Sequence, residues 1–409
     1  MRNEPHLALT KFLLAATTLG ATLASSSAAE VNLLGPTLPP VDIHGFGSQG
    51  YIINSGHNDY LGGDSSSGTY DFREYGLNAS VAKGKWRVGA QVFGQKLGPY
   101  GDDKMTLDWG SVDYQAEQWL GVRAGRVKMP RGLYNESLDL DFTRPFVLLP
   151  QSVYDARLRD FQASVDGGLV YGNVGLGKAG SFDYKAFGGT KSMSTHSGAS
   201  DYFNLDAPFP NEKIGVDAAW GGSFFWNTPL QGLKAGYSFT QYDNLSTFRF
   251  VPFRNETTDK VAPEFDRHLF SLEYMVGNWV FAAEGGWDDS DYYVAHQTGA
   301  KYAFLYPSDY YFYVSASWRA TSWLELGAYY SKYHWEQRGV GTPVIFPDLD
   351  QGDLAICSRF DITDHVAFKL EGHYLDGSGA VFDVPSHPQP PAGRDDSWFM
   401  FATKLTVSF

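Results

Sequence analysis

Apolar and polar residues alternate along most of this 409-residue chain, in runs of about ten residues that follow one another at short intervals. In the run 365–375, for example, Phe368 and Leu370 lie on one face and Lys369 and Glu371 on the other. A period of two predicts β-strands that bury one face in apolar surroundings and leave a second face that tolerates charge. No long stretch with the 3.6-residue period of a helix accompanies these runs, so the fold class is all-β.

Counting the runs gives about sixteen antiparallel strands. We place them at 41–53, 70–82, 85–96, 105–115, 118–128, 162–175, 181–190, 213–226, 232–242, 266–276, 279–288, 309–320, 322–335, 351–361, 365–375 and 398–409. Short turns such as Gly277-Asn278 alternate with longer loops, and an even count suits a single-chain bacterial barrel. The stretch 243–265 leaves eighteen strands open, because Thr247–Phe253 could supply an extra hairpin.

A soluble β-sandwich would show the same alternation. Runs of about ten residues with Trp and Tyr near their ends favour a transmembrane barrel with aromatic girdles. The last run, 398–409, places Phe399 and Phe401 on one face and Lys404 on the other, and it ends on Phe409. Such an ending resembles the C-terminal signature of bacterial outer-membrane barrels. Closure pairs every backbone N–H and C=O without an edge, and about sixteen strands leave room for an aqueous channel.

Composition excludes several classes of protein. Aromatic residues make up 16% of the chain although the mean hydropathy is only −0.28. The formal net charge of −14 argues against nucleic acid as a partner, which would call for clustered Lys and Arg. A single cysteine, Cys357, excludes an intrachain disulfide framework, and we expect it to pack against lipid or a neighbouring strand.

The N-terminus predicts export. Arg2 and Lys11 precede an apolar run over 12–24, and the small residues Ser27-Ala28-Ala29 supply a cleavage site. We expect residues 1–29 to be a secretory signal peptide; a buried N-terminal helix is the alternative, and the order of these features favours the signal.

The segment Met129–Phe161 interrupts the strand pattern. At about 30 residues it is longer than most connections between elements in compact domains. It carries both signs of charge around an apolar stretch, PFVLLP at Pro145–Pro150, that a free surface loop would have little reason to carry. A long loop of this kind is expected to fold against the rest of the protein with its charges facing a polar space. In the strand count it is the third external loop, and we expect it to fold into the lumen.

Motifs of enzymes and metal sites are weak. Gly45-x-Gly47-x-x-Gly50 matches a dinucleotide fingerprint but lies inside an expected strand with no helix after it. Asp348, Asp350 and Asp353 resemble a calcium loop without the glycine and the terminal glutamate that such a loop needs. The sequence therefore predicts no catalytic residue, no metal site and no cofactor.

The run GRVKMPRGLYNESLDLDFTRPFVLLPQSVYDARLRDF (Gly125 to Phe161), followed by DGGLVYGNVG (Asp166 to Gly175), resembles the constriction region of Gram-negative outer-membrane porins. The resemblance implies a single outer-membrane barrel over 30–409 that passes small hydrophilic solutes down a gradient. It also implies a homotrimer in contact with outer-membrane lipid and lipopolysaccharide. In motif it covers only Gly125 to Gly175.

A porin constriction gains from acids on one side and bases on the opposite wall, because a transverse field selects solutes by charge. The residues expected at the constriction within 129–161 are Arg131, Glu136, Asp139, Asp141, Arg144, Asp155, Arg157 and Arg159. The residues expected to line the wider bore are Arg87, Arg123, Lys369 and Glu371. The alternative is that these charges form ordinary ion pairs at the rim, which contribute little to stability.

The sequence thus favours a passive diffusion channel. The first alternative is a substrate-selective channel, in which aromatics along the lumen wall would favour sugars and a basic ladder would favour anions. A barrel enzyme comes after these, because no Ser–His or paired-carboxylate motif is present. A secreted β-rich binding protein also comes after them, because it would leave the terminal Phe409 strand unexplained.

Overall fold

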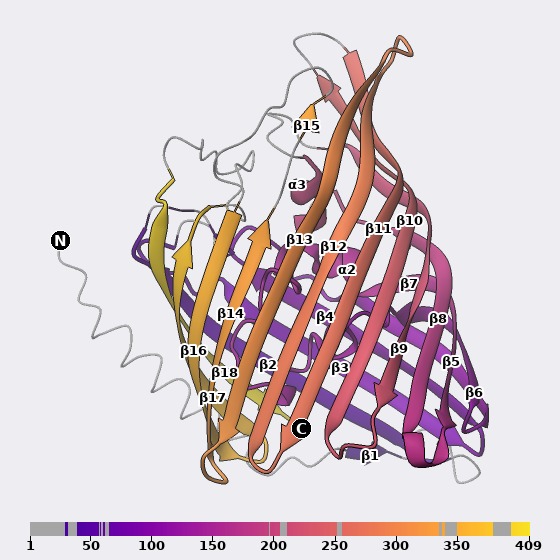
Figure 1. Cartoon of the computed structure of the whole chain (residues 1–409), viewed down its shortest axis with the longest axis vertical. Helices are drawn as coiled ribbons and strands as arrows, with labels where there is room; N and C mark the ends of the chain where they lie inside the picture. The colour runs from indigo at the N-terminus through magenta and orange to yellow at the C-terminus, as the bar shows by residue number, and fades with distance from the viewer. Residues whose placement is uncertain are drawn as a thin grey trace.

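The computed structural model describes residues 29–31, 39–56, 58, 60–61, 65–195, 197–204, 211–251, 256–334, 338–339, 350–378 and 394–409. Within this part of the chain, sixteen long antiparallel strands form one closed barrel (Figure 1). The count of sixteen is confirmed. The expected signal peptide falls almost wholly outside the described residues, and its cleavage stays a prediction.

The first eight strands of the barrel are β2 (Val41–Asn54), β3 (Phe72–Lys83), β4 (Trp86–Leu97), β5 (Thr106–Glu117), β6 (Leu120–Lys128), β7 (Ser164–Gly175), β8 (Ser181–Ser192) and β9 (Lys213–Asn227). The other eight are β10 (Leu233–Val251), β11 (Glu256–Val276), β12 (Trp279–His296), β13 (Lys301–Arg319), β14 (Leu324–His334), β16 (Asp350–Thr363), β17 (Val366–Asp376) and β18 (Ser397–Ser408). Two short strands are added to these: β1 (Ala29–Val31) pairs with β2, and β15 (Arg338–Gly339) pairs with β13.

Each strand pairs with its neighbour in sequence, and the last closes on the first. The β18–β2 ladder runs from Met400 opposite Asn54 to Ser408 opposite Phe46. The backbone N–H of Phe409 donates to the carbonyl of Gly45, so the C-terminal residue continues the closure. Closure leaves no free edge, which satisfies the backbone without helices.

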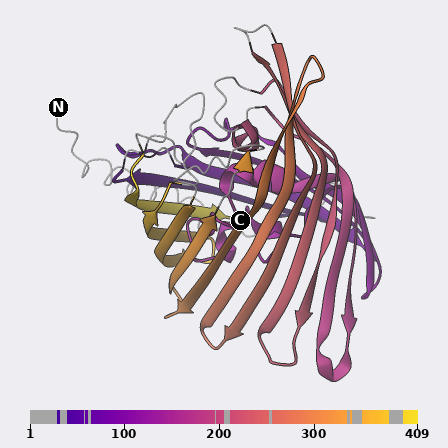
Figure 2. The same cartoon turned by 45° about the horizontal axis from the view of Figure 1, so that its top comes forward.

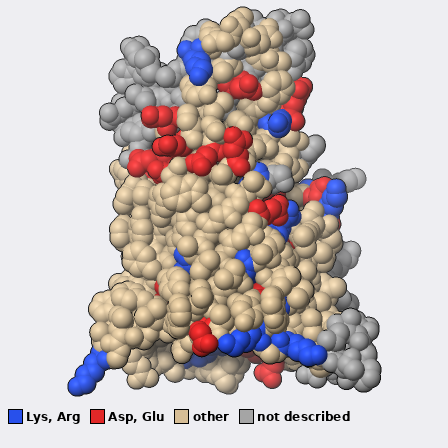
Figure 3. All heavy atoms as spheres, turned by 90° about the vertical axis from the view of Figure 1, so that its right-hand side faces the viewer, with Lys and Arg blue, Asp and Glu red and all other residues tan. Residues whose placement is uncertain are grey.

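The two faces of the strands differ as the alternation predicts. Trp86, Val88, Phe399 and Phe401 are exposed, whereas Lys369, Glu371 and Lys404 are almost fully buried. The exposed apolar face is the outer one, because the inner face of a closed barrel is screened by the opposite wall and by the side chains packed against it. In Figure 3 the middle of the outer surface carries few charges, with acids gathered above it and bases below.

Strands β10–β13 are longer than expected. They contain 19, 21, 18 and 19 residues, and Figure 2 shows them extending well beyond the rest of the barrel. The predicted end at 242 is wrong, because the β10–β11 ladder continues past Asn244, a non-glycine residue with φ of 53°. Residues 243–251 lengthen β10 and residues 256–265 lengthen β11, and the two stay paired with each other, so in the described residues the eighteen-strand alternative is wrong.

Short turns join the strands at one end. β3 and β4 are joined by Gly84-Lys85 and β11 and β12 by Gly277-Asn278, and both glycines have positive φ, 61° and 57°. A two-residue hairpin turn requires this conformation, which glycine adopts without steric cost. The long connections, among them 129–163 and the described parts of 193–212, lie at the other end.

In the described residues, helical structure lies only in connections between strands. Between β6 and β7 lie three short 3₁₀ turns, η1 (Asn135–Ser137), η2 (Asp141–Thr143) and η3 (Ala156–Leu158), and the helix α2 (Arg159–Gln162). α3 (Gly198–Asn204) follows β8, and η4 (Gly177–Ala179) joins β7 to β8. None of the helices in the described residues has the length and apolar character of a membrane-spanning helix.

Candidate channel site

The segment Met129–Phe161 packs against the barrel wall for most of its length. Its apolar stretch is buried: Val147 is 1% exposed and Phe146, Leu148 and Leu149 are each 4–6% exposed. The prediction that this stretch anchors the segment against the rest of the protein is therefore confirmed by its packing.

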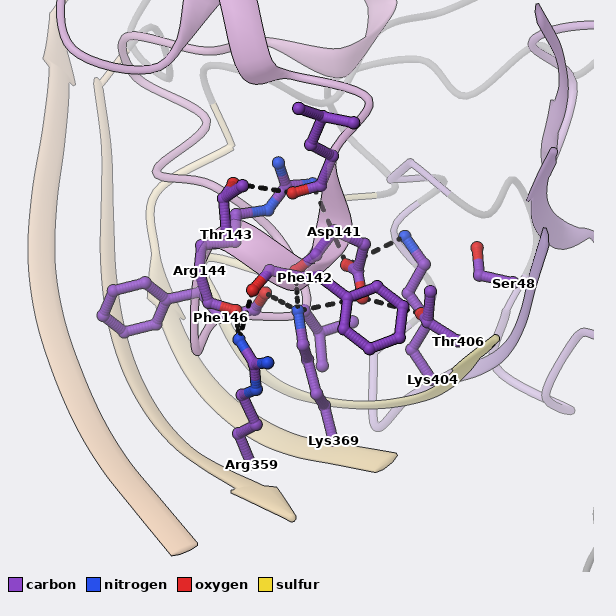
Figure 4. A network of polar contacts seen from close by, with 12 residues as sticks. Ser48, Asp141, Phe142, Thr143, Arg144, Phe146, Arg359, Lys369, Lys404 and Thr406 are labelled. Atoms are coloured by element: carbon purple, nitrogen blue, oxygen red, sulfur yellow. Dashed lines mark hydrogen bonds and ion pairs between the residues drawn. The ribbon is translucent and has the colours of Figure 1, made fainter. Parts of the chain in front are cut away.

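A buried carboxylate holds the centre of the segment to the last two strands (Figure 4). One oxygen of Asp141, Oδ2, lies 2.9 Å from Nζ of Lys369 on β17 and accepts a 2.7 Å hydrogen bond from Oγ1 of Thr406 on β18. The other oxygen lies 3.4 Å from Nζ of Lys404, and Lys404 also pairs with Glu74 of β3. One aspartate of the segment thus joins two lysines of neighbouring strands.

The charges in this network depend on one another. Asp141, Lys369 and Lys404 are at most 2% exposed, and a charge buried so deeply is costly unless it is paired. Burial by itself would raise the pKa of Asp141, but Lys369, Lys404 and Arg144 outweigh it and hold this pKa well below the usual range of an aspartate. Loss of the carboxylate would therefore leave two buried ammonium groups without their shared partner.

Backbone groups of the segment are held by the same wall. Glu371 accepts hydrogen bonds of 2.9 Å from the backbone N–H groups of Val147 and Leu148. Arg359 of β16 donates to the carbonyl oxygens of Phe142, at 2.6 Å, and Arg144, at 3.3 Å. These bonds fix the path of the segment's backbone, in addition to the position of the Asp141 side chain.

A second anchor lies on β12 and β13. Glu284 accepts hydrogen bonds from the backbone N–H of Leu133, at 2.9 Å, and from the hydroxyls of Tyr313, at 2.8 Å, and Tyr154. Arg131 donates to the hydroxyl of Tyr311, at 3.0 Å. Both side chains of this anchor are buried, Glu284 and Arg131 each at 2% exposure.

The end of the segment packs against an apolar part of the inner face. Phe161 stacks on Tyr242 of β10, with ring centroids 4.1 Å apart, and contacts Phe203 of α3 edge-on. Val165 and Leu169 of β7 belong to the same buried cluster. The inner face of β7–β11 therefore carries an apolar cluster, against which side chains of the connections after β6 and β8 pack.

Beside β3–β6 the packing is open. A cavity of about 310 Å³ is bounded by these strands and by the early part of the segment. Its walls are formed by Asn78, Arg87, Gly89, Gln91, Trp109, Ser111, Asp113, Arg123, Arg126, Val127, Lys128, Glu136, Asp139 and Leu140. Asp139 crosses to the wall and bonds with Lys128 and Gln91, and Arg123 pairs with Asp113 at 2.8 Å.

The structure divides the expected constriction residues into two groups. Glu136 and Asp139 border the cavity, and Glu136 pairs with Lys185 of β8. The others make contacts within the protein: Arg131 and Asp141 hold the anchors above, Arg144 donates to the carbonyl of Leu138, Arg157 pairs with Asp155, and Arg159 pairs with Asp108. Arg131, Asp141, Arg144 and Arg157 are at most 7% exposed, and Asp139, although it borders the cavity, is only 2% exposed, so these side chains present little surface to a solute.

The expected bore-lining residues divide in the same way. Arg87 and Arg123 border the cavity. Lys369 and Glu371, at 0% and 1% exposure, hold the segment instead. Their inward direction is as predicted, but alternation alone could not indicate that a loop covers them.

Several residues of the site were missed from the sequence. Lys404 was placed on the face of the last strand opposite Phe399 and Phe401 but not assigned to the site, although a lysine on that face was a usable signal. Glu284, Asp108 and Trp109 carry no local motif, and only the barrel register brings them to the segment or the cavity.

The residues of the weak motifs have structural roles where the structure describes them. Gly45–Gly50 lies within β2, and Asp353 on β16 bonds to His373 and Tyr329, while Asp348 lies outside the described residues. Cys357 is buried against Phe146 and Tyr329, so it faces inward and not toward lipid. Among the described residues no group of three or more His, Cys, Asp or Glu side chains could hold a metal ion.

Comparison with known proteins finds similar folds but no similar sequence. No known protein family and no curated protein matches the sequence. Solved structures match with 11–14% identity. The outer-membrane channel DcaP of Acinetobacter baumannii has a TM-score of 0.56 at 12% identity, over 93% of this chain and 100% of that one. OmpT of Vibrio cholerae has a TM-score of 0.53 at 14% identity, over 90% and 98%.

A third similar structure is the anion-selective porin from Comamonas acidovorans, with a TM-score of 0.51 and 14% identity over 90% of this chain and 99% of that one. The chain therefore has the fold of outer-membrane porins, a closed barrel of sixteen antiparallel strands. Among the barrels of this fold it is similar to proteins described as porins and channels.

Proposed function

We propose that this protein is an outer-membrane porin that forms a water-filled channel for the passive diffusion of small hydrophilic solutes and ions. The observation that carries the proposal is the closed sixteen-strand barrel with an apolar outer face, polar inner positions and an open cavity between β3–β6 and the segment Met129–Phe161. A barrel of about sixteen strands is wide enough to enclose an aqueous path.

In this proposal the segment lies within the bore and narrows it. Its anchors on β10–β13 and on β16–β18 hold it to one side, so solutes pass along the wall of β3–β6. The charges next to this path are Arg87, Arg123, Arg126 and Lys128 on the wall, with one acid, Asp113, among them, and Glu136 and Asp139 on the segment. Bases on the wall and acids on the segment would create a transverse field across the path.

A second candidate is a substrate-selective channel, and its support comes from the tight attachment of the segment. Asp139 bonds to Gln91 and Lys128, so the segment also reaches the wall that borders the cavity. A passage narrowed by this contact would favour solutes that the cavity can bind. The two candidates differ in whether the flux of a solute saturates with its concentration.

The fold supports proposals for the membrane contacts, the orientation and the oligomeric state of the protein. The apolar belt suits contact with outer-membrane lipid and lipopolysaccharide, and the short turns would lie on the periplasmic side. One structure of Vibrio cholerae OmpT is described as a trimer form, and we propose a homotrimer for this chain as well. The measurement is the mass of the folded protein in detergent, and a monomeric mass would contradict the trimer.

Reconstitution in a planar bilayer tests the proposed function. We expect stepwise openings whose conductance grows with salt concentration, and a reversal potential in a salt gradient that identifies the preferred ion. A linear increase with solute concentration favours diffusion, whereas saturation favours the selective channel. Absence of conductance from folded protein would contradict both candidates.

A further inference from the structure

We propose that the cavity beside β3–β6 is a binding subsite for small organic carboxylates that carry a flat apolar body. The inference rests on the proposed function, since it names the class of solute that the path along this wall would retain. It is carried by Arg87, Arg123 and Trp109, which border the same cavity of about 310 Å³.

Arg87 is the cation available to a ligand. It is inward-facing on β4, between the exposed outer residues Trp86 and Val88, and its side chain is exposed. Its guanidinium donates to Oγ of Ser80 at 3.2 Å, and no carboxylate of the described residues lies within ion-pair distance of it. Asp113, its partner across the ladder, is engaged by Arg123 and by the hydroxyl of Tyr171. A guanidinium with unused donors beside a cavity matches the geometry of a carboxylate.

Arg123 adds a second positive group at the same end of the cavity. Its Nε donates to Asp113 at 2.8 Å, its guanidinium lies over the ring of Tyr171, and a third of its side chain is still exposed. The pair with Asp113 holds this guanidinium in place. Together the two arginines and the single carboxylate leave a net positive charge at this end, which favours anions over neutral solutes.

Trp109 provides the flat apolar surface. It is paired with Gln91 across the ladder, and its Cη2 lies 3.3 Å from where a β-carbon on Gly89 would stand. The ring therefore lies on the bare backbone at Gly89, between the inward positions of Arg87 and Gln91. An indole face next to a guanidinium suits a ligand with a planar body and a carboxylate at one end.

The test uses benzoate as the probe, with acetate and benzamide as comparison ligands. Acetate keeps the carboxylate without the ring, and benzamide keeps the ring without the charge. Binding to the folded barrel in detergent is measured by calorimetry and by Trp fluorescence, neither of which requires ion conduction. Block of the single-channel current by each ligand is measured in parallel.

We expect benzoate to bind more tightly than either comparison ligand. Arg87→Gln should weaken benzoate binding by roughly tenfold or more, because a charged hydrogen-bonding group is lost. Trp109→Leu should weaken benzoate by about two- to tenfold and leave acetate unchanged. Lys85→Gln, in the exposed turn two residues from Arg87, is the matched control and should change neither.

Equal binding of benzoate and benzamide, or an Arg87→Gln variant that binds benzoate as the wild type does, would overturn the subsite even if the barrel conducts. Benzoate binding that depends on Arg87 in a barrel that does not conduct would support the subsite and contradict the channel. Retention of a neutral sugar in place of benzoate would also overturn it.

Discussion

Two flanks of the segment Met129–Phe161 use similar charged residues under different conditions. On the β16–β18 flank, Asp141, Lys369 and Lys404 are sealed from water and bonded to one another. On the β3–β6 flank, Arg87 and Arg123 border an open cavity and keep part of their surface exposed. The difference shows that burial, more than residue type, separates the charges held by partners within the protein from those that stay accessible from the cavity.

The largest effect is expected from Asp141→Asn. Removal of the charge leaves Lys369 and Lys404 buried without their shared carboxylate, which typically costs about 3–5 kcal/mol of unfolding free energy. Urea unfolding of the folded barrel in detergent measures this cost. Asp160→Asn, at a carboxylate that is half exposed and 3.9 Å from Arg159, is the control and should change stability little. Equal effects of the two variants would erase the contrast between the flanks.

Lowering the pH should reduce the unfolding free energy that Asp141 contributes in the wild type, and Asp141→Asn should not show this loss. The folded-state pKa of Asp141 lies below its unfolded value of about 3.9. A lowered pKa stabilises the fold above the unfolded value, and this contribution is lost as the pH falls below it. The gap between wild type and Asp141→Asn should therefore be constant from pH 7 to 5 and shrink by about 1.4 kcal/mol per unit below about pH 4.

Urea midpoints at pH 7, 5 and 3 give this gap. A gap that persists unchanged at pH 3 would show that the carboxylate charge of Asp141 does not stabilise the fold.

On the open flank, Arg123→Gln should alter ion selectivity more than stability. The pair with Asp113 is partly exposed, so we expect a loss of about 1 kcal/mol or less. The reversal potential in a salt gradient should move toward cation preference, because Asp113 is then left uncompensated beside the path. A large loss of stability with unchanged selectivity would place Arg123 among the anchoring residues.

The smallest effect is expected from Lys85→Gln in the turn between β3 and β4. Lys85 and Glu117 are 54% and 63% exposed, and such pairs contribute about 0–1 kcal/mol. Unfolding free energy and conductance should both stay close to those of the wild type. A marked change in either would mean that charges at the turns also influence the bore.

The sequence predicts the barrel well because its signals are local. Alternation gives the strand count and the inward direction of Lys369 and Glu371, and the charged, apolar segment Met129–Phe161 stands out by its length. The length of β10 was underestimated because Asp243-Asn244 resembles a strand end, whereas the β10–β11 ladder continues through it.

The partners of the charges could not be predicted, since they are set by long-range register. Asp141 and Lys404 are 263 positions apart in number, and only barrel closure brings them together. For the same reason the apolar cluster around Phe161 and Phe203 was missed, because it depends on two loops that fold toward the same wall.

The most direct test of the account is the conductance of a Ser111→Cys channel before and after a charged thiol reagent. Ser111 borders the cavity, whereas the native Cys357 is 1% exposed and should not react. The account predicts stepwise openings whose conductance falls on modification of Ser111→Cys and does not change in the wild type. Openings that are unaffected after complete modification, verified by mass, would contradict a path along β3–β6.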